Sequence, residues 1–325
     1  VDALPAGDIG AVAKLHGTLT GDTLSAGGRA AAPPIGFPSP VLSVAVSARN
    51  RNDEDKLANA LHRLVEEDPV LTVTRNDETR QTLLGGLGET HLRNVVARLE
   101  RKFGVQVDKE DARVAYRETI TGTFSAEGKY KKQSGGHGQF GIAAIRIEPL
   151  SAGSGFEFAD EVRGGVIPRQ FIPAVEAGIV DAMAHGGSSG YPVVDVRAAV
   201  FDGKHHAVDS SEMSFKMAGR LAFQEALGGA RPVVLEPVSA VEVTIPSDCL
   251  GDVMGDLSSR RATVQGSDMD MWGDQVISAM VPEAEMMRYS IDLRSITGGR
   301  GRFTIRHDHY AQVPAGVSVP APPER

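Results

Sequence analysis

Two stretches of this chain show the same order of strand-like and helix-like segments, and this pattern constrains the fold more than any other feature. Over residues 40–115, short alternating apolar runs enclose two segments in which apolar residues recur every three or four positions. The first predicted helix stops before Pro69 and the second stops at Gly104, and both residue types commonly end helices. The order β-α-β-β-α-β is that of the ferredoxin-like, or split βαβ, unit.

Residues 238–310 repeat this order with a different sequence. The segment between them, residues 116–237, has another pattern: a predicted hairpin, then two helices with apolar stripes over residues 168–186 and 210–229, with a strand between the helices. We therefore expect an α+β fold in which two ferredoxin-like units flank an elongated α/β domain.

The two ends of the chain differ from these units. Residues 1–39 contain two short predicted strands around Gly17–Gly21 and then a Pro/Gly/Ala-rich stretch. Two short strands cannot bury a core alone, so we expect this segment to complete a domain whose remainder is missing, and hence a piece of a longer protein. The first residue, Val1 in place of a methionine, agrees with this expectation. Residues 311–325 are Pro-rich, and we expect a loose tail.

Charge and cysteine content exclude several classes of protein. The formal net charge is −8, which argues against a protein that coats nucleic acid with its whole surface. The single cysteine, Cys249, cannot form an internal disulfide. No apolar run approaches the roughly 20 residues that span a bilayer. Local basic clusters stand out against this acidic background, at Lys129–Lys132 and at Arg294–Arg306.

Common catalytic and metal-binding patterns are not found in the sequence. A phosphate-binding loop needs G-x-x-x-x-G-K-[ST], and no such string is present. His205, His206 and Asp209 are close in sequence, but a metal site needs several convergent ligands. Ser210 and Ser211 precede a predicted helix, where a short polar side chain is typical of an N-cap. We therefore expect no catalytic, nucleotide-binding or metal-binding residues.

The segment Gly128–Gly141, "GKYKKQSGGHGQFG", has two interpretations that the residues alone leave open. Its lysines can neutralise phosphates, its glycines allow close backbone approach, and His137 or Phe140 can stack on bases. The alternative is a flexible hairpin end with no partner.

Several motifs together resemble bacterial elongation factor G. "GKYKKQSGGHGQFG", "GGVIPRQFIPAVEAGI", "GYPVVDV", "HAVDSSEMSFKMAGRLAF" and "PVVLEPV" are similar to its domain IV. "ETRQTLLGGLGETHLRNVVARLERKFGVQV" resembles its domain III, and "GDVMGDLSSRRATVQG" and "VPEAEMMRYSIDLRSITGGRGRF" resemble its domain V. Residues 1–39 resemble the end of its domain II β-barrel, which would be incomplete here. The implied domains are 1–39 with a linker, 40–115, 116–237, 238–310 and the tail 311–325.

The resemblance implies a ribosome-binding protein whose partners are ribosomal RNA, the A-site tRNA and mRNA. In the family, the tip of domain IV reaches the decoding site, and here two loops would form it, Ser134–Gly141 and Lys204–Asp209. A third tip segment would be Gly186–Tyr191, and His206 occupies the position of the family's tip histidine. In the family, domain V faces the large ribosomal subunit. The implied contact residues are Lys129, Lys131, Lys132, Ser134, Gly135, Gly136, His137, Gly138, Gln139, Phe140, His205, His206, Asp209, Arg260, Arg261, Arg294 and Arg300.

Departures from the family pattern limit what the resemblance implies. The GTP-binding domain is absent from this sequence, so GTP and Mg²⁺ would belong to a missing N-terminal domain of the parent protein and this chain would not be an enzyme. The tip reads "SGGHGQFG", where the common pattern of translocases is "SGGRGQYG". We therefore expect a diverged paralogue, cytoplasmic and monomeric. The alternatives are a paralogue that acts in ribosome recycling or protection, and a free-standing, non-enzymatic RNA- or ribosome-binding module.

Overall fold

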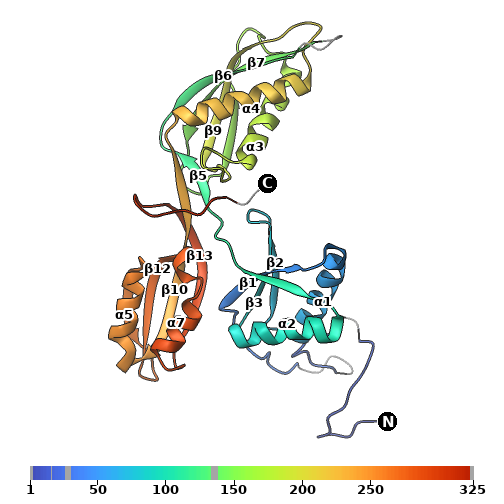
Figure 1. The fold of residues 1–325 in the computed structure, drawn as a ribbon, viewed down its shortest axis with the longest axis vertical. Coiled ribbons are helices and arrows are strands. Elements are labelled where there is room, and N and C mark those ends of the chain that lie inside the picture. The colour runs from blue at the N-terminus through green and yellow to red at the C-terminus, as the bar shows by residue number, and fades with distance from the viewer. Residues whose placement is uncertain (1–2, 16, 26–30, 133–137, 323–325) are drawn as a thin grey trace. The chain divides into compact units, whose positions relative to one another are not determined.

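The computed structural model describes residues 3–15, 17–25, 31–132 and 138–322, and Figure 1 shows the fold. The chain divides into two compact units, Val1–Asn76 with Gln81–Ala112, and Asp77–Arg80 with Arg113–Arg325. None of the helices in the described ranges combines the length and the apolar character that crossing a bilayer requires.

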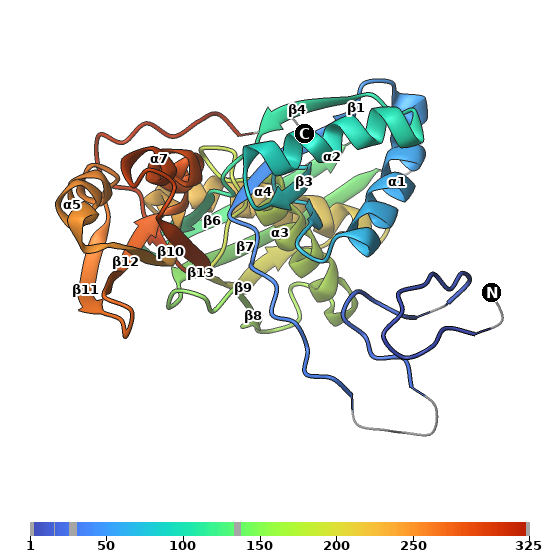
Figure 2. The same cartoon turned by 90° about the horizontal axis from the view of Figure 1, so that it is seen from below.

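The first unit contains a four-stranded antiparallel sheet in the order β2-β3-β1-β4. Helices α1 and α2 lie side by side in both views (Figures 1 and 2). Their apolar stripes are buried, and Leu64 and Leu99 have no exposed surface. The elements are β1 (Leu42–Ala48), a 3-10 helix (Arg51–Asp53), α1 (Glu54–Glu67), β2 (Thr72–Asn76), β3 (Gln81–Gly86), α2 (Glu89–Phe103) and β4 (Val107–Asp111). The predicted ferredoxin-like order is confirmed.

The second unit contains the central domain, residues 117–231, whose sheet has the order β6-β7-β9-β8. Strand β8 runs parallel to β9, and the other pairs are antiparallel. The elements are β5 (Arg117–Ile120), β6 (Phe124–Lys132), β7 (Gln139–Pro149), β8 (Phe156–Asp160), a 3-10 helix (Arg169–Phe171), α3 (Ile172–His185), β9 (Val196–Lys204) and α4 (Glu212–Gly229). The predicted hairpin and both helices are confirmed, whereas β8 was not predicted.

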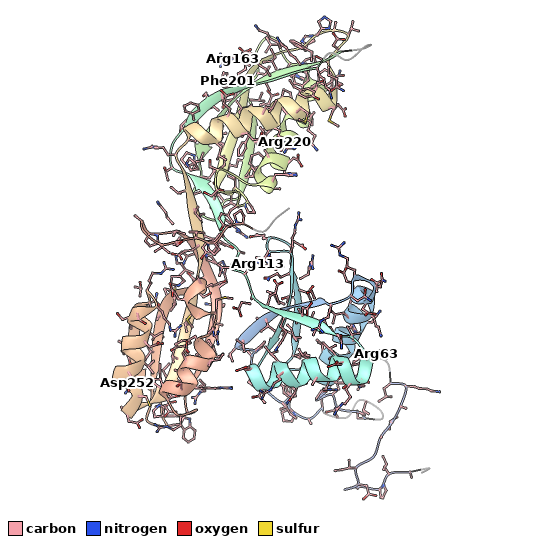
Figure 3. The ribbon with its side chains drawn as sticks, viewed as in Figure 1. Arg63, Arg113, Arg163, Phe201, Arg220 and Asp252 are labelled. Atoms are coloured by element: carbon pink, nitrogen blue, oxygen red, sulfur yellow. The ribbon has the colours of Figure 1, made fainter. Side chains whose placement is uncertain are left out.

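Helix α4 packs very closely on the central sheet and on α3. A Cβ atom at Gly128 of β6 would lie 2.0 Å from the carbonyl oxygen of Ala218, so glycine is required there. Arg220 of α4, labelled in Figure 3, reaches Asp181 of α3 with 3.6 Å between Nη1 and Oδ2. The resulting core is fully buried, and Ile145, Phe215 and Phe223 are at most 1% exposed.

The C-terminal domain, residues 232–322, repeats the ferredoxin-like order with the sheet β11-β12-β10-β13. Its elements are β10 (Pro232–Pro246), a 3-10 helix (Ser247–Cys249), α5 (Leu250–Ser259), β11 (Thr263–Met269), β12 (Asp274–Pro282), α6 (Glu283–Met286), α7 (Tyr289–Ile296) and β13 (Arg302–Gln312). The first residues of β10 pair with β5 of the central domain, from Pro232 opposite Ile120 to Leu235 opposite Arg117. One strand is therefore shared by the two domains.

Four expectations differ from the structure. The two strands expected around Gly17–Gly21 are not formed in the described residues, because a strand needs a partner to accept its hydrogen bonds. The helix expected over residues 283–299 is divided, since Arg288 has a non-helical φ of −118°. Strand β10 starts at Pro232, seven residues before its predicted start at Ser239. The tail is attached at two points: the Val313 amide donates to Val234, and the Tyr191 hydroxyl donates to the Pro320 carbonyl.

Candidate nucleic-acid interface

The end of the central domain where β9 stops brings together two segments that are 70 residues apart in sequence, Gly138–Phe140 and His205–Ser211, and we call them the tip. Asp209 joins them, because its Oδ1 accepts from the Gly138 amide at 3.0 Å and its carbonyl accepts from the Phe140 amide at 2.8 Å. The Ser210 hydroxyl donates to the Phe140 carbonyl at 2.8 Å. The structure thus places both of the expected tip loops side by side, as far as they are described. Ser134, Gly135, Gly136 and His137 lie outside the described residues.

His206 is exposed at the tip and is held at one ring nitrogen. Its Nδ1 lies 3.2 Å from Asp209 Oδ2 and 3.2 Å from the Asp209 amide, and half of the side chain, 54%, is exposed. Its ring lies beside that of Phe140, tilted by 59°, with 6.2 Å between the centroids. His205 is oriented elsewhere, since its Nδ1 lies 3.1 Å from the Val166 carbonyl oxygen. His206 is therefore a half-exposed histidine, held through Nδ1, next to an aromatic ring.

The basic residues of strand β6 are not equivalent. Lys129 pairs with Glu127 at 2.7 Å, and this carboxylate raises the pKa of Lys129. Lys131 lies over the ring of Phe140, with Nζ 5.3 Å from the centroid. Lys131 and Lys132 are both exposed, and Gln139 of β7 stands opposite Lys132. Positive charge, an aromatic ring and amide donors thus meet at the end of this hairpin.

A groove of about 650 Å³ lies beside Lys129, between β6 and α4. Its lining includes Glu127 and Glu225, so two carboxylates surround one ammonium group. A phosphate cradle needs the opposite balance of charge. The groove therefore does not support a nucleotide site.

The segment Gly186–Tyr191 does not belong to the tip, which corrects the expectation. It precedes the start of β9, whereas the tip loop follows the end of that strand. The carboxylate of Glu118, a residue of β5 with no exposed surface, accepts from the Ser189 and Tyr191 amides at 2.9 and 3.0 Å. Burial raises the pKa of Glu118. This segment is thus fixed at the β5 end of the domain, and the direction of β9 explains why.

Arg260 and Arg261 are engaged within the C-terminal domain, which disfavours them as RNA contacts. Arg260 bonds to Asp256 and Asp292 at 2.8 and 2.7 Å. Arg261 donates to both carboxylate oxygens of the buried Glu236, at 2.7 and 2.8 Å. Hydrogen bonding to Glu236 raises the pKa of Arg261. Both guanidinium groups therefore stabilise the domain, and few of their donors are left for phosphates.

Two further arginines were expected to contact RNA. Arg300 is half exposed and pairs with Asp248 at 3.0 Å, and Arg294 lies in the last turn of α7. An exposed pair of this kind is weak and exchanges readily with other partners. RNA contact by Arg294 and Arg300 stays a prediction.

Two features at or near the tip were not predicted from the sequence: the role of Ser210 and the exposed apolar side chains of Val208 and Met213. Ser211 caps α4, as the motif predicted, because its hydroxyl accepts from the Ser214 amide at 3.2 Å. The neighbouring Ser210 was assigned to the same cap, but it joins the two tip loops instead. Val208 and Met213 expose 64% and 57% of their surface. The sequence feature that could have indicated the role of Ser210 is its position: it is a polar residue directly before the N-cap residue Ser211.

Comparison with known families follows the same division of the chain. Residues 112–231 match the family model "Elongation factor G, domain IV". Residues 37–111 match "Elongation Factor G, domain III", and residues 233–318 match "Elongation factor G C-terminus". The chain belongs to the elongation factor G family.

A solved relative agrees with this assignment. A crystal structure of a protein from Thermus thermophilus is 41% identical and superposes with a TM-score of 0.77. The match covers 87% of this chain and 42% of the other, so the chain spans less than half the length of that protein. Residues 37–111, the central domain and the C-terminal domain thus correspond to domains III, IV and V of the elongation factor G family, and the matched domains do not include a GTP-binding domain.

Proposed function

We propose that this chain is the ribosome-contacting portion of an elongation factor G-type GTPase and that the tip of domain IV binds RNA in the A site. The observation that carries the proposal is the pair of tip loops joined by Asp209 and Ser210. This arrangement holds Lys131, Phe140 and His206 at one end of the domain. The tip would occupy the A site after the tRNA and mRNA have moved, and it would in this way stabilise the moved state.

Recognition at the tip would depend on charge and shape. Lysines neutralise phosphates, and aromatic or histidine rings stack on unpaired bases. No covalent chemistry is assigned to these domains, and their residues do not fit a GTP and Mg²⁺ site, because the sequence lacks the phosphate-binding loop. We also propose that the parent protein hydrolyses GTP and is a cytoplasmic monomer.

A second candidate function is ribosome recycling or protection by a diverged paralogue. The sequence feature that favours it is His137, which stands where the translocase pattern has arginine. Arginine carries a permanent charge, whereas histidine titrates near neutral pH. An in vitro translocation assay separates the two, because full activity of the parent protein would exclude the paralogue role.

The double variant Lys131→Gln/Lys132→Gln is expected to bind ribosomes more weakly and with a flatter salt dependence. Each lost phosphate contact removes about 0.7–0.9 from the slope of log affinity against log salt, so the slope should fall by about 1–2. Binding is measured by co-sedimentation over a series of salt concentrations. Lys109→Gln, an exposed lysine of β4, is the control and should leave the slope unchanged. An unaltered slope in the double variant would exclude the tip from RNA binding.

His206→Ala, made in the parent protein with its GTP-binding domain, is expected to slow tRNA movement by roughly fivefold, the equivalent of one net hydrogen bond of about 1 kcal/mol. Thermal unfolding should be unchanged, because the side chain is half exposed. His185→Ala is the matched control: its side chain is exposed to a similar degree, 53%, but it lies at the end of α3. A large loss of thermal stability in His206→Ala would instead make this histidine structural.

A further inference from the structure

The turn between β11 and β12 of domain V displays the most exposed apolar side chains of that domain. Met269, Met271 and Trp272 expose 65%, 87% and 81% of their surface. Large apolar groups that protrude together in this way are typical of interaction sites. Trp272 is also the single tryptophan of the chain. We call Met269–Asp274 the Met–Trp turn.

The Met–Trp turn is held by a compact set of hydrogen bonds. Asp270 Oδ1 accepts from the amides of Trp272 and Asp274 at 2.8 and 3.0 Å. The Asp270 amide donates to the Asp274 carbonyl at 2.8 Å, and Gly273 completes the turn with a φ of +87°. Ser247 fixes the turn from outside, because its hydroxyl donates to the Gly273 carbonyl at 2.9 Å. A turn organised in advance loses little conformational entropy when a partner binds.

The charges around the turn favour one class of partner. The turn contains Asp270 and Asp274, Asp268 precedes it in β11, and Asp248 and Asp252 follow Ser247, which contacts the turn. Two guanidinium groups, those of Arg300 and Arg302, pair with carboxylates of this set. Asp252, labelled in Figure 3, lies in the first turn of α5, directly after Ser247–Cys249. Arg302 lies within 3.8 Å of Asp270 and 3.7 Å of Asp274, and Arg300 pairs with Asp248. The surroundings therefore carry an excess of negative charge, which repels RNA phosphates and attracts lysine and arginine side chains.

We propose that the Met–Trp turn docks into an apolar pocket, edged by lysine or arginine, on a protein of the ribosome. Tryptophan and methionine are enriched in the cores of protein interfaces, and a few such side chains supply most of the binding energy. The acidic surroundings match a basic rim. This inference rests on the proposed function, because the ribosome is where the partner would be met.

The single tryptophan makes the test direct. The full chain is titrated with ribosomes while the emission of Trp272 is followed as the difference from the same titration of the Trp272→Phe chain, and binding is measured in parallel by co-sedimentation. Burial in an apolar pocket shifts the emission to shorter wavelength. A photoreactive benzoylphenylalanine at position 271 then identifies the contact. We expect a blue shift and an adduct that protease removes and ribonuclease does not.

Two variants complete the test. Trp272→Ala is expected to lower ribosome affinity by at least about thirtyfold, as for an interface hot spot, with unchanged thermal unfolding because the side chain is exposed. Asp268→Lys, at an exposed position of β11, should lower the affinity for a basic rim and would raise it for RNA. Bound ribosomes with no blue shift, or an adduct that ribonuclease removes, would overturn this inference and leave the proposed function intact. A chain that does not co-sediment at all would overturn both.

Discussion

Replacing Arg261 by methionine is expected to lower the free energy of unfolding of domain V by about 3–5 kcal/mol. Glu236 is 3% exposed, and Arg261 neutralises it through two hydrogen bonds. Without the guanidinium group the carboxylate stays buried beside Glu285, which Arg261 also binds at 2.9 Å. An uncompensated buried charge of this kind is among the most destabilising single changes. Thermal or urea unfolding of the full chain measures the loss.

The double variant Arg261→Met/Glu236→Met is the control for this prediction. Apolar residues of similar size often replace a buried ion pair at little cost, so most of the lost stability should return. A double variant as unstable as Arg261→Met would show that the arginine acts through its packing and not through its charge. Arg261→Lys should be intermediate, because lysine keeps the charge but not the two-pronged geometry.

Gly219→Ala in helix α4 is expected to destabilise domain IV by about 1–3 kcal/mol or more, although alanine favours helices. A Cβ atom at Gly219 would lie 2.4 Å from the carbonyl oxygen of Val175 and 3.0 Å from its Cα. Both atoms belong to the backbone of α3, so a rotamer change cannot relieve the overlap, and the two helices must separate. Differential scanning calorimetry of the full chain detects the shift of the domain IV transition.

The same helix provides a matched control for the glycine variant. Gly228 is exposed, and a Cβ atom there has no neighbour within 4 Å. Gly228→Ala should therefore raise stability, by up to about 1 kcal/mol, because alanine has the higher helix propensity. Shifts of the same sign in both variants would refute close helix packing as the reason for Gly219.

The regular elements could be predicted where a repeated spacing of apolar residues marks a buried face. Leu57, Leu61 and Leu64 recur at helical spacing, and all three are at most 5% exposed in α1. Strand β8 has only five residues, and only some of their side chains are half-buried, so it gives a weak pattern. The start of β10 contains Pro232 and Pro237, which lower any strand prediction because proline has no amide hydrogen. The first part of β10 pairs with β5, a strand more than 100 residues earlier in the chain, and a local sequence pattern does not show such a pairing.

The candidate site could be predicted only in part, because neighbours in space are not neighbours in sequence. The two tip loops were expected together from the family resemblance, and Asp209 joins them. Arg261 was expected to contact RNA, because the sequence does not show that it pairs with Glu236, which precedes it by 25 residues in another element. Gly186–Tyr191 was assigned to the tip from the family resemblance, although it precedes β9 whereas the tip loop follows that strand. Charge and loop composition in the sequence identify candidate RNA-binding residues, and the topology of the fold determines which of them lie together.

The effect of an insertion or deletion in strand β10 should depend on whether it changes the chain by an odd or an even number of residues. The fifteen residues of β10 pair first with β5 and later with β12 and β13, with a register shift against β13 between Val238 and Ser239. Neighbouring side chains of a strand point to opposite faces of the sheet. One residue inserted between Leu235 and Val238 would put the later part of the strand out of phase with the earlier part, so that the apolar face of one domain would turn to solvent. An insertion of two residues would restore the phase. In this segment, single-residue insertions and deletions should therefore be far more damaging than changes of two.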